Sequence, residues 1–404
     1  MMWRTACAGL LLVLMGVGPA MAGAIAVLQH QPGDPSRPWT WAVISSKLDL
    51  ISKTGFTAIL LSPHQKSCGG NKSLGYDPYD YTSFESAHGT EVELRALIKK
   101  AHVLKIQVYA DMVLNHMCAG INYRYPRFTK EHFHTLGKIQ DFNNQNEVEN
   151  GALIGLDDLR QEMPYVRGEL WKFILKTKDV GFDGYRWDAA KHVPRWYWRD
   201  HVLLNPIGRG AYNFGEVYSG DYDYLFSYIS LGMAVTDYPL YFQIRDNFRA
   251  GGSFYRVNGA GIAVRDGLKA LTFVENHDVG PPPYRRLAQA FIAVYPGYPA
   301  YFNVLLPDQW LENVVWLQNH LAAGAGDYQQ RYVERDVLIF TRGDRLLAGF
   351  NKSTSWTNKW VQTPWKNATL HDHTGHVMDE VTDNSGRVEV WIPPMGYIVM
   401  APMR

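Results

Sequence analysis

The stretch GFDGYRWDAAKH, residues 181–192, begins like a buried strand and then becomes rich in charge. An arginine, an aspartate, a lysine and a histidine fall within seven residues of it. Successive side chains of a strand point to opposite faces, so Arg186 and Asp188 face the same way. A cation beside a carboxylate favours the ionised acid. The spacing indicates that Asp188 works as a charged acid at a strand end, with a purely structural ion pair as the alternative.

Three further segments end in polar side chains after an apolar, strand-like run: DMVLNH (111–116), NFGEVY (213–218) and FVENHD (273–278). They contribute His116, Glu216, His277 and Asp278. The C-terminal ends of parallel strands meet at one edge, where barrel proteins place their catalytic groups. Any single cluster could be a hydrogen-bonded structural group, and we interpret Asp111, early in its strand, in that way. Folding alone does not account for all four clusters.

Strand-like and helical segments alternate over most of the chain. Helical spacing of apolar residues predicts helices over Glu91–Leu104 and Tyr165–Thr177. Such alternation indicates a parallel α/β sheet, open or closed, and eight strands favour a (β/α)8 TIM barrel. The eight predicted strands are Ala24–Leu28, Phe56–Leu61, Ile106–Val113, Phe182–Arg186, Tyr212–Glu216, Ala234–Tyr238, Leu271–Val274 and Ala300–Val304.

Changes in polarity and in the spacing of apolar residues along the chain predict its domains. A polar, irregular stretch, residues 117–156, is expected to be a short inserted loop domain after the third strand. Residues 327–404 alternate like short strands and predict a C-terminal antiparallel β-sandwich domain. The barrel then comprises residues 23–116 and 157–326.

The first 22 residues resemble an export signal. Arg4 precedes an apolar run, Ala6–Val17, and Ala20-Met21-Ala22 fits a cleavage site, which predicts a signal peptide at residues 1–22. A retained membrane helix is the alternative, but the apolar run is short for one. We therefore expect a secreted protein, extracellular or periplasmic. Export would permit a disulfide between Cys68 and Cys118, although two unpaired thiols are an equally open alternative.

Charge and composition limit the kinds of partner that the protein is expected to bind. Lys and Arg number 40 and Asp and Glu 39, a net charge of +1 that offers no electrostatic case for nucleic acid or an anionic membrane. Aromatic residues make up 13% of the chain, and they serve either the core or flat platforms for a sugar or another ring. We expect a monomer.

The four polar segments, in their order and spacing, resemble the signature regions of the α-amylase family of glycoside hydrolases. The resemblance runs from about residue 24 to the C-terminus and implies a retaining hydrolase of α-1,4 bonds in starch, glycogen and maltooligosaccharides, acting within the chain. It makes Asp188 the nucleophile, Glu216 the general acid/base and Asp278 the acid that stabilises the transition state. We expect Arg186 to lower the pKa of Asp188 and apolar neighbours to raise that of Glu216.

The resemblance also implies sugar contacts. Tyr76, in GYDPYDY, matches an aromatic that stacks on the sugar, with a packed loop tyrosine as the alternative. His116 and His277 match hydrogen-bond partners of the sugar hydroxyls, beside Arg186. Lys191 resembles a contact on the leaving-group side, with a solvated lysine as the alternative.

Finally, the resemblance implies a structural Ca2+ that joins the inserted loop to the barrel. The matching ligands are Asn115, Asp158, the backbone carbonyl of His192 and Glu149, the last of which could instead be a solvated loop acid. Chloride is not expected, because YPGYPAYFN (295–303) offers no Arg or Lys.

Two rival functions stay open at this stage. An exo-acting, maltooligosaccharide-forming amylase or a transglycosylase of the same superfamily would share all of these motifs. A non-catalytic member that only binds glycan would typically lack an acid, whereas Asp188, Glu216 and Asp278 are all present.

Overall fold

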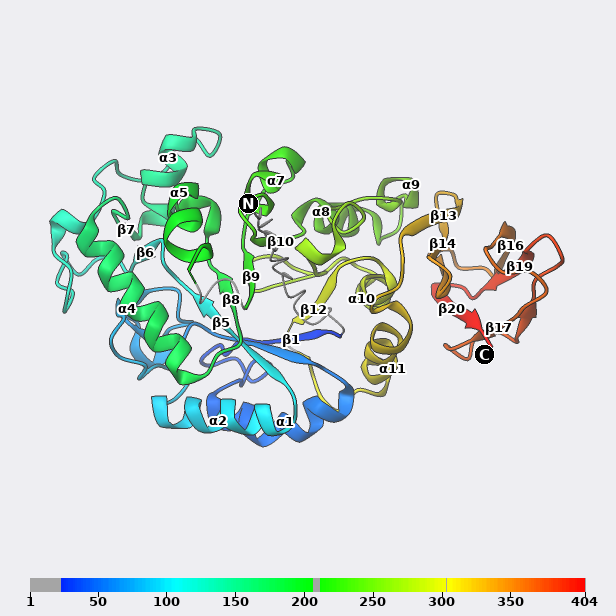
Figure 1. Cartoon of the computed structure of the whole chain (residues 1–404), viewed down its shortest axis with the longest axis horizontal. Coiled ribbons are helices and arrows are strands. Elements are labelled where there is room, and N and C mark those ends of the chain that lie inside the picture. Colours follow the sequence, from blue (N-terminus) through cyan, green and yellow to red (C-terminus); the bar gives the residue numbers. More distant parts are fainter. Residues whose placement is uncertain (1–22, 206–210, 303, 404) are drawn as a thin grey trace, which may run out of the picture.

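The eight predicted strands form a closed parallel barrel. The computed structural model describes residues 23–205, 211–302 and 304–403, so the predicted signal peptide lies outside the described residues. Neighbours around the barrel follow chain order, and the last strand pairs with the first (Figure 1). This confirms the predicted (β/α)8 architecture. The barrel strands are β1 (Ile25–Leu28), β2 (Ala58–Leu61), β5 (Gln107–Met112), β8 (Gly184–Trp187), β9 (Tyr212–Gly215), β10 (Ala234–Thr236), β11 (Ala270–Thr272) and β12 (Tyr298–Phe302).

Helices follow the strands and cover the outside of the barrel. The two predicted from spacing are α2 (Glu91–Val103) and α4 (Pro164–Val180). A capping box between Thr90 and Glu93 starts α2, and Gly181 ends α4 at a φ of 114°, a conformation that glycine adopts without strain. The other helices are α1 (Trp41–Thr54), α5 (Arg195–Tyr197), α7 (Tyr222–Ile229), α8 (Tyr238–Asn247), α9 (Phe254–Val257), α10 (Arg285–Val294) and α11 (Gln309–Leu317).

The sixth predicted strand is too long at its C-terminal end. β10 stops at Thr236, because the Asp237 carboxylate accepts a hydrogen bond from the Leu240 N–H and thereby caps α8. Tyr238, predicted as the last strand residue, is instead the first residue of α8.

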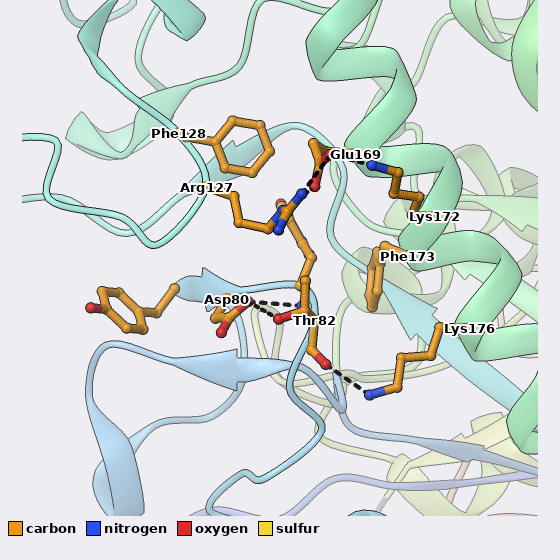
Figure 2. A pocket seen from close by; sticks show the side chains of 10 residues that line it. Asp80, Thr82, Arg127, Phe128, Glu169, Lys172, Phe173 and Lys176 are labelled. Atoms are coloured by element: carbon orange, nitrogen blue, oxygen red, sulfur yellow. Dashed lines mark hydrogen bonds and ion pairs between the residues drawn. The ribbon is translucent and has the colours of Figure 1, made fainter.

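The segment after β5 leaves the barrel through a short antiparallel pair, β6 (His116–Met117) and β7 (Asp157–Asp158), and contains the helix α3 (Gln145–Asn150). Arg127 from this segment pairs with Glu169 on α4 (Figure 2). Glu169 is 5% exposed and also binds Lys172 Nζ at 2.7 Å, so the insertion is held against the barrel by a nearly buried carboxylate.

Beyond α11 the chain forms two packed antiparallel sheets. One face of the larger sheet packs on the barrel through Phe340 and Phe350, whose rings lie 6.1 and 5.5 Å from that of Phe291 on α10. The other face shares a core with the smaller sheet, which confirms the predicted β-sandwich. The larger sheet has the order β13 (Tyr328–Val333), β14 (Val337–Arg342), β15 (Leu346–Asn351), β20 (Gly396–Pro402), β17 (Thr369–Asp372), β18 (Glu380–Val381), and the smaller pairs β16 (Thr357–Gln362) with β19 (Arg387–Ile392).

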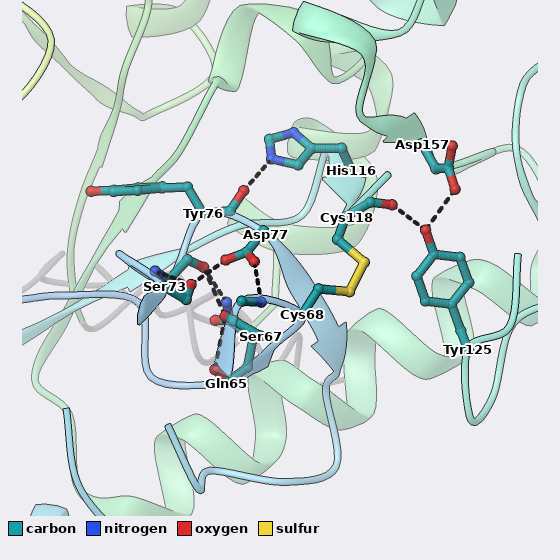
Figure 3. The surroundings of a disulfide bond; sticks show 12 residues. Gln65, Ser67, Cys68, Ser73, Tyr76, Asp77, His116, Cys118, Tyr125 and Asp157 are labelled. Carbon is teal, nitrogen blue, oxygen red and sulfur yellow. Dashed lines mark hydrogen bonds between the residues drawn. A yellow bond between two sulfur atoms is a disulfide. The ribbon is translucent and has the colours of Figure 1, made fainter. Parts of the chain in front are cut away.

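The two cysteines that could pair do form a disulfide. Cys68 and Cys118 are bonded with their Cα atoms 6.2 Å apart (Figure 3). Cys68 follows β3 (Lys66–Ser67), which pairs with β4 (Pro78–Asp80), so the bridge ties the loop that bears Tyr76 to the start of the insertion. Among the residues that the structure describes, no helix is long and apolar enough to cross a membrane.

Replacing both bridge cysteines, Cys68→Ser with Cys118→Ser, should lower the free energy of unfolding. A bridge that closes a loop with a sequence separation of 50 residues typically contributes about 2–4 kcal/mol. Thermal melting measures this, with reductant as the control: dithiothreitol should lower the melting temperature of the wild type and leave the variant unchanged. An equal response of both proteins to reductant would contradict the assignment.

Candidate active site

One arginine joins three carboxylates at the C-terminal end of the barrel. Arg186 Nη1 lies 2.5 Å from Asp111 Oδ1 and 3.1 Å from Asp188 Oδ1, and its Nη2 lies 2.9 Å from Glu216 Oε2. The register of the barrel explains this meeting, because Asp111 on β5 is the strand partner of Arg186 on β8, and β8 pairs with β9. The Arg186 side chain is 6% exposed, so these contacts are shielded from water.

Backbone contacts fix the two predicted catalytic acids. The N–H of Asp188 donates to the Met112 carbonyl and that of Glu216 to the Trp187 carbonyl, at 3.0 and 2.9 Å. Between them, Ala189 adopts a left-handed φ of 46°, which costs a non-glycine residue about 1–2 kcal/mol. This turn lets the Ala189 N–H donate to Glu216 Oε2 at 3.1 Å. Local strain thus helps to position the Glu216 carboxylate.

The pKa values run opposite to the prediction from sequence. Burial raises the pKa of Asp188 well above its ordinary value, against the pull of Arg186 and with the help of the Glu216 charge. Burial also raises the pKa of Glu216, but Arg186 and His277 outweigh it, so that the net pKa of Glu216 is lowered. The prediction was wrong because it assigned Arg186 to Asp188 alone. The guanidinium is shared by three acids, and one cation cannot neutralise them all.

Asp278 lies at the edge of this cluster. It follows β11, its side chain is 53% exposed, and its Oδ2 is 3.2 Å from His277 Nε2. Partial burial and the nearby Glu216 charge raise its pKa to about 6. The third predicted acid is therefore within electrostatic reach of Glu216, on the solvent side of the cluster.

The structure brings three of the predicted sugar contacts together. The Tyr76 hydroxyl donates to Asp111 Oδ2 at 2.7 Å, and its ring stacks on His277 with centroids 4.7 Å apart. His116 Nε2 donates to the Tyr76 carbonyl at 3.1 Å (Figure 3), and Asn115 Nδ2 faces its other nitrogen at 3.2 Å. Burial lowers the pKa of both His116 and His277 to about 4, so both rings are neutral at pH 7. His116 thus uses both nitrogens within the protein, and its contact with a sugar stays a prediction.

Lys191 lies on the side of the insertion. Its Nζ donates to the Tyr218 carbonyl at 3.1 Å and lies 5.5 Å from the centre of the Phe142 ring and 5.8 Å from that of Tyr218. Lys191 therefore connects the insertion to the loop after β9, close enough to Glu216 for the charge of that acid to affect its pKa.

Sequence reasoning missed two residues of the site, and a third, Asp111, makes the hydrogen-bonded structural contacts that were expected of it. Asp111, interpreted as a structural group, is fully buried and lies in the centre of the cluster. The Tyr238 hydroxyl donates to Glu216 Oε1 at 3.2 Å, and Gln29 Nε2 donates to the Tyr76 hydroxyl at 2.5 Å. Of these three residues, only Asp111 lies in a polar segment that the sequence pattern had singled out, the one that ends at His116.

Two of the predicted calcium ligands, Asn115 and Asp158, have a side-chain oxygen that accepts no hydrogen bond from a described residue. These atoms, Asn115 Oδ1 and Asp158 Oδ1, are both buried. They are neighbours, because β6 starts at His116 and His116 pairs with Asp158. Uncommitted amide and carboxylate oxygens are the donors that Ca2+ prefers, so these two residues fit the ion.

The side chains of the other two predicted ligands, Glu149 and His192, each have a hydrogen-bond partner. Glu149 accepts a hydrogen bond from Gln145 Nε2 at 2.7 Å, and the His192 ring faces the Val148 carbonyl at 2.9 Å. No three Asp, Glu, His or Cys side chains in residues 23–205, 211–302 and 304–403 are arranged to hold one ion. A cation beside Asp158 would thus depend on amide and carbonyl oxygens.

Family models match parts of both the barrel and the C-terminal β-sandwich. Residues 30–150 match the family model "Alpha amylase, catalytic domain", and residues 346–401 match the model "Alpha-amylase C-terminal". Both matches are to alpha-amylases, and in these two segments the chain is similar to that family.

Curated relatives show the same similarity over part of their length. The chain is 34% identical to the beta/alpha-amylase of Paenibacillus polymyxa over 58% of its own length and 20% of that protein. It is 29% identical to the alpha-amylase of Aeromonas hydrophila, over 59% and 58% of the two chains. Alpha-amylase 3 of Schizosaccharomyces pombe is 31% identical, over 65% and 52%. The chain thus spans between a fifth and three fifths of these relatives.

Solved structures share the whole fold. The alpha-amylase of Geobacillus thermoleovorans superposes with a TM-score of 0.82 over 95% of this chain and 99% of that one, at 23% identity. The alpha-amylase of Malbranchea cinnamomea gives 0.81 over 95% and 96%, at 19% identity.

Replacing Arg186 by Met should destabilise the protein by about 3–5 kcal/mol, because buried carboxylates lose their cation. The pKa of Asp188, already raised by burial, would rise further, and that of Glu216 would rise above its value in the unfolded chain. Such groups favour the folded state at low pH and lose that contribution as pH rises, so the loss should be larger at pH 8 than at pH 5. Denaturant unfolding at both pH values measures it.

The matched control is Arg245→Met. Arg245 is 46% exposed and pairs with Asp246 at 2.8 Å, so its loss should cost about 0–1 kcal/mol at either pH. Equal effects of the two substitutions would contradict the role of Arg186.

Proposed function

We propose that the protein is a secreted, retaining endo-hydrolase of α-1,4-glucosidic bonds in starch and glycogen. The observation that supports this most directly is that Asp188 and Glu216 contact one guanidinium group at the open end of the barrel. Retaining glycosidases need two carboxyl groups about 5–5.5 Å apart on either side of the scissile bond. The alpha-amylases among the relatives make α-glucan the substrate to propose.

The proposed reaction has two steps. The Asp188 carboxylate attacks the anomeric carbon while Glu216 gives its proton to the departing glycosidic oxygen, which forms a glycosyl–Asp188 ester and a free chain end. Glu216, now ionised, takes a proton from water, and the resulting hydroxide displaces Asp188. The second displacement restores the α-configuration and both carboxyl groups.

In this scheme the cluster of Arg186 and its carboxylates must allow the proton to move between Asp188 and Glu216. The first step needs an ionised Asp188 and a protonated Glu216, whereas burial raises the pKa of Asp188 and Arg186 lowers that of Glu216. We infer that the entering sugar redistributes the proton, since it separates the two acids and removes water. Arg186 would balance the charge in either arrangement.

The other side chains would hold the sugar. The Tyr76 ring and His277 would contact the sugar at the cleaved position, and Asp278 would stabilise the positive charge that develops on the ring. His116 and Lys191 would complete the contacts, with Lys191 on the leaving-group side. Arg186 would act on the sugar indirectly, through the position and charge of the acids that it binds.

We further propose a structural Ca2+ held by Asn115, Asp158 and the His192 carbonyl, with Glu149 as a fourth residue. When bound, the ion would neutralise Asp158 and join the insertion to the barrel. His134 Nδ1 lies 2.6 Å from Asp158 Oδ2 and would orient that carboxylate. The absence of chloride activation and the monomeric state stay predictions.

Glu216→Gln should lower kcat on soluble starch by about 10²–10⁴-fold, the usual contribution of general acid–base catalysis. Asp188→Asn should abolish turnover, because an amide is a poor nucleophile. Reducing-end formation measures both, and NMR of the first product should show the α-anomer. A fall in viscosity ahead of reducing ends would indicate attack within the chain.

Glu275→Gln is the matched control. Glu275 lies in the same FVENHD segment but pairs with Arg285 at 2.5 Å, so activity should stay within a few-fold of wild type. Wild-type rates in Asp188→Asn, a β-anomeric product, or a folded wild type inactive on all α-glucans would each contradict the proposed function.

Removal of calcium should lower the melting temperature by several degrees, because a ligand that binds only the folded state stabilises it. Calorimetry with EDTA, and then with added Ca2+, measures this without reference to activity. Asn115→Ala should abolish the response, and Asp157→Asn should keep it, since Asp157 binds the Tyr125 hydroxyl at 2.6 Å. No EDTA effect on the wild type would contradict the calcium site.

A further inference from the structure

The smaller sheet of the β-sandwich exposes two tryptophans on one face. We define the tryptophan face as the six outward side chains of β16 and β19: Asn358, Trp360, Gln362, Arg387, Glu389 and Trp391. Trp360 is 58% exposed and Trp391 is 41% exposed. A further exposed indole, Trp356, directly precedes β16.

This face points away from the barrel. The larger sheet lies between the barrel and the smaller sheet, since its two faces pack on α10 and on β16 and β19 respectively. The inward residues of the smaller sheet, Val361, Val388 and Val390, are buried in the sandwich core. Figure 1 shows β16 and β19 at the end of the molecule opposite the insertion. The core therefore does not need the two indoles.

The indoles are held in place by polar neighbours. Trp360 lies opposite Glu389 and Trp391 lies opposite Asn358, so the rings are diagonal neighbours on the two strands. Glu389 accepts hydrogen bonds from Asn358 Nδ2 at 2.5 Å and from Trp391 Nε1 at 3.3 Å. The Arg387 guanidinium lies 5.5 Å from the Trp360 ring centre. Binding to this face would therefore cost little ordering of side chains.

The chemistry of the face matches an uncharged polyol. Indole rings offer flat apolar surface for the C–H face of a sugar, while amide, guanidinium and carboxylate groups beside them can bind hydroxyls. Arg387 and Glu389 cancel in charge, which gives no attraction for an anionic polymer or a strongly charged peptide. A single exposed aromatic needs no explanation, but two on one ordered strand pair indicate a binding surface.

We propose that the tryptophan face is a second binding site for α-glucan chains, separate from the barrel and built into the sandwich itself. The ligand class rests on the proposed function. A polymer bound at this face would be presented to the barrel at a raised effective concentration, which benefits an enzyme acting on long or insoluble chains.

The test uses the full chain with Asp188→Asn, so that bound glucan is not hydrolysed. Retardation in native gels that contain amylose measures binding. Trp360→Ala with Trp391→Ala should weaken the binding at least about tenfold, since two stacking contacts are lost. Trp360→Phe with Trp391→Phe should restore much of it. Trp316→Ala is the matched control, because Trp316 is 40% exposed on α11 and should leave retardation unchanged.

Three outcomes would overturn the proposal. The first is unchanged amylose binding in the folded double alanine variant, and the second is equal retardation by a β-1,4-glucan. The third is light scattering that shows a dimer for the wild type and a monomer for the double alanine variant. The proposed function is judged separately, by wild-type hydrolysis of a short maltooligosaccharide too small to reach both sites. Hydrolysis without binding at the face would remove only the second site.

Discussion

Arg186 is a buried cation with three carboxylates around it, and the geometry of the open barrel end depends on that contact. Asp111, Asp188 and Glu216 arise from three adjacent strands, β5, β8 and β9. Without the guanidinium their mutual repulsion and their loss of water would favour opening of the barrel at this end. The same shared cation explains why Asp188 and Glu216 do not titrate independently, because each proton that one of them gains changes the field at the other.

Stability and chemistry are therefore linked at this site. An acid paired with its own arginine would be ionised, whereas three acids that share one arginine cannot all be ionised without an unbalanced negative charge, and this raises the pKa of Asp188. The strained turn at Ala189 and the Tyr238 hydroxyl each add a donor to Glu216, and Tyr76 adds one to Asp111. These donors are fixed by backbone and packing, which is the condition for electrostatic preorganisation.

Segments outside the barrel hold the loops that complete this site. The disulfide fixes the Tyr76 loop to the beginning of the insertion, and the contact between Arg127 and Glu169 fixes the insertion to α4. The buried oxygens of Asn115 and Asp158 lie at the root of the same insertion. The disulfide and the Arg127–Glu169 pair thus act as two separate constraints on one long polar segment. The β-sandwich contributes no side chain to the acid cluster, which leaves its outward face available for another role.

The sequence by itself determined the architecture. Apolar runs of strand length alternate with helical spacing, and this local pattern predicts the eight barrel strands within a few residues, the helices α2 and α4, and the β-sandwich. Polar ends on four strands likewise predicted which segments meet, because parallel strands end at one edge. Tertiary structure decided the rest. Arg186 seemed dedicated to Asp188, and Tyr238 was placed in a strand, since register between strands and burial depend on residues far apart in the chain. The pKa values reversed for the same reason: they depend on how many charges share one cavity, which no local pattern records.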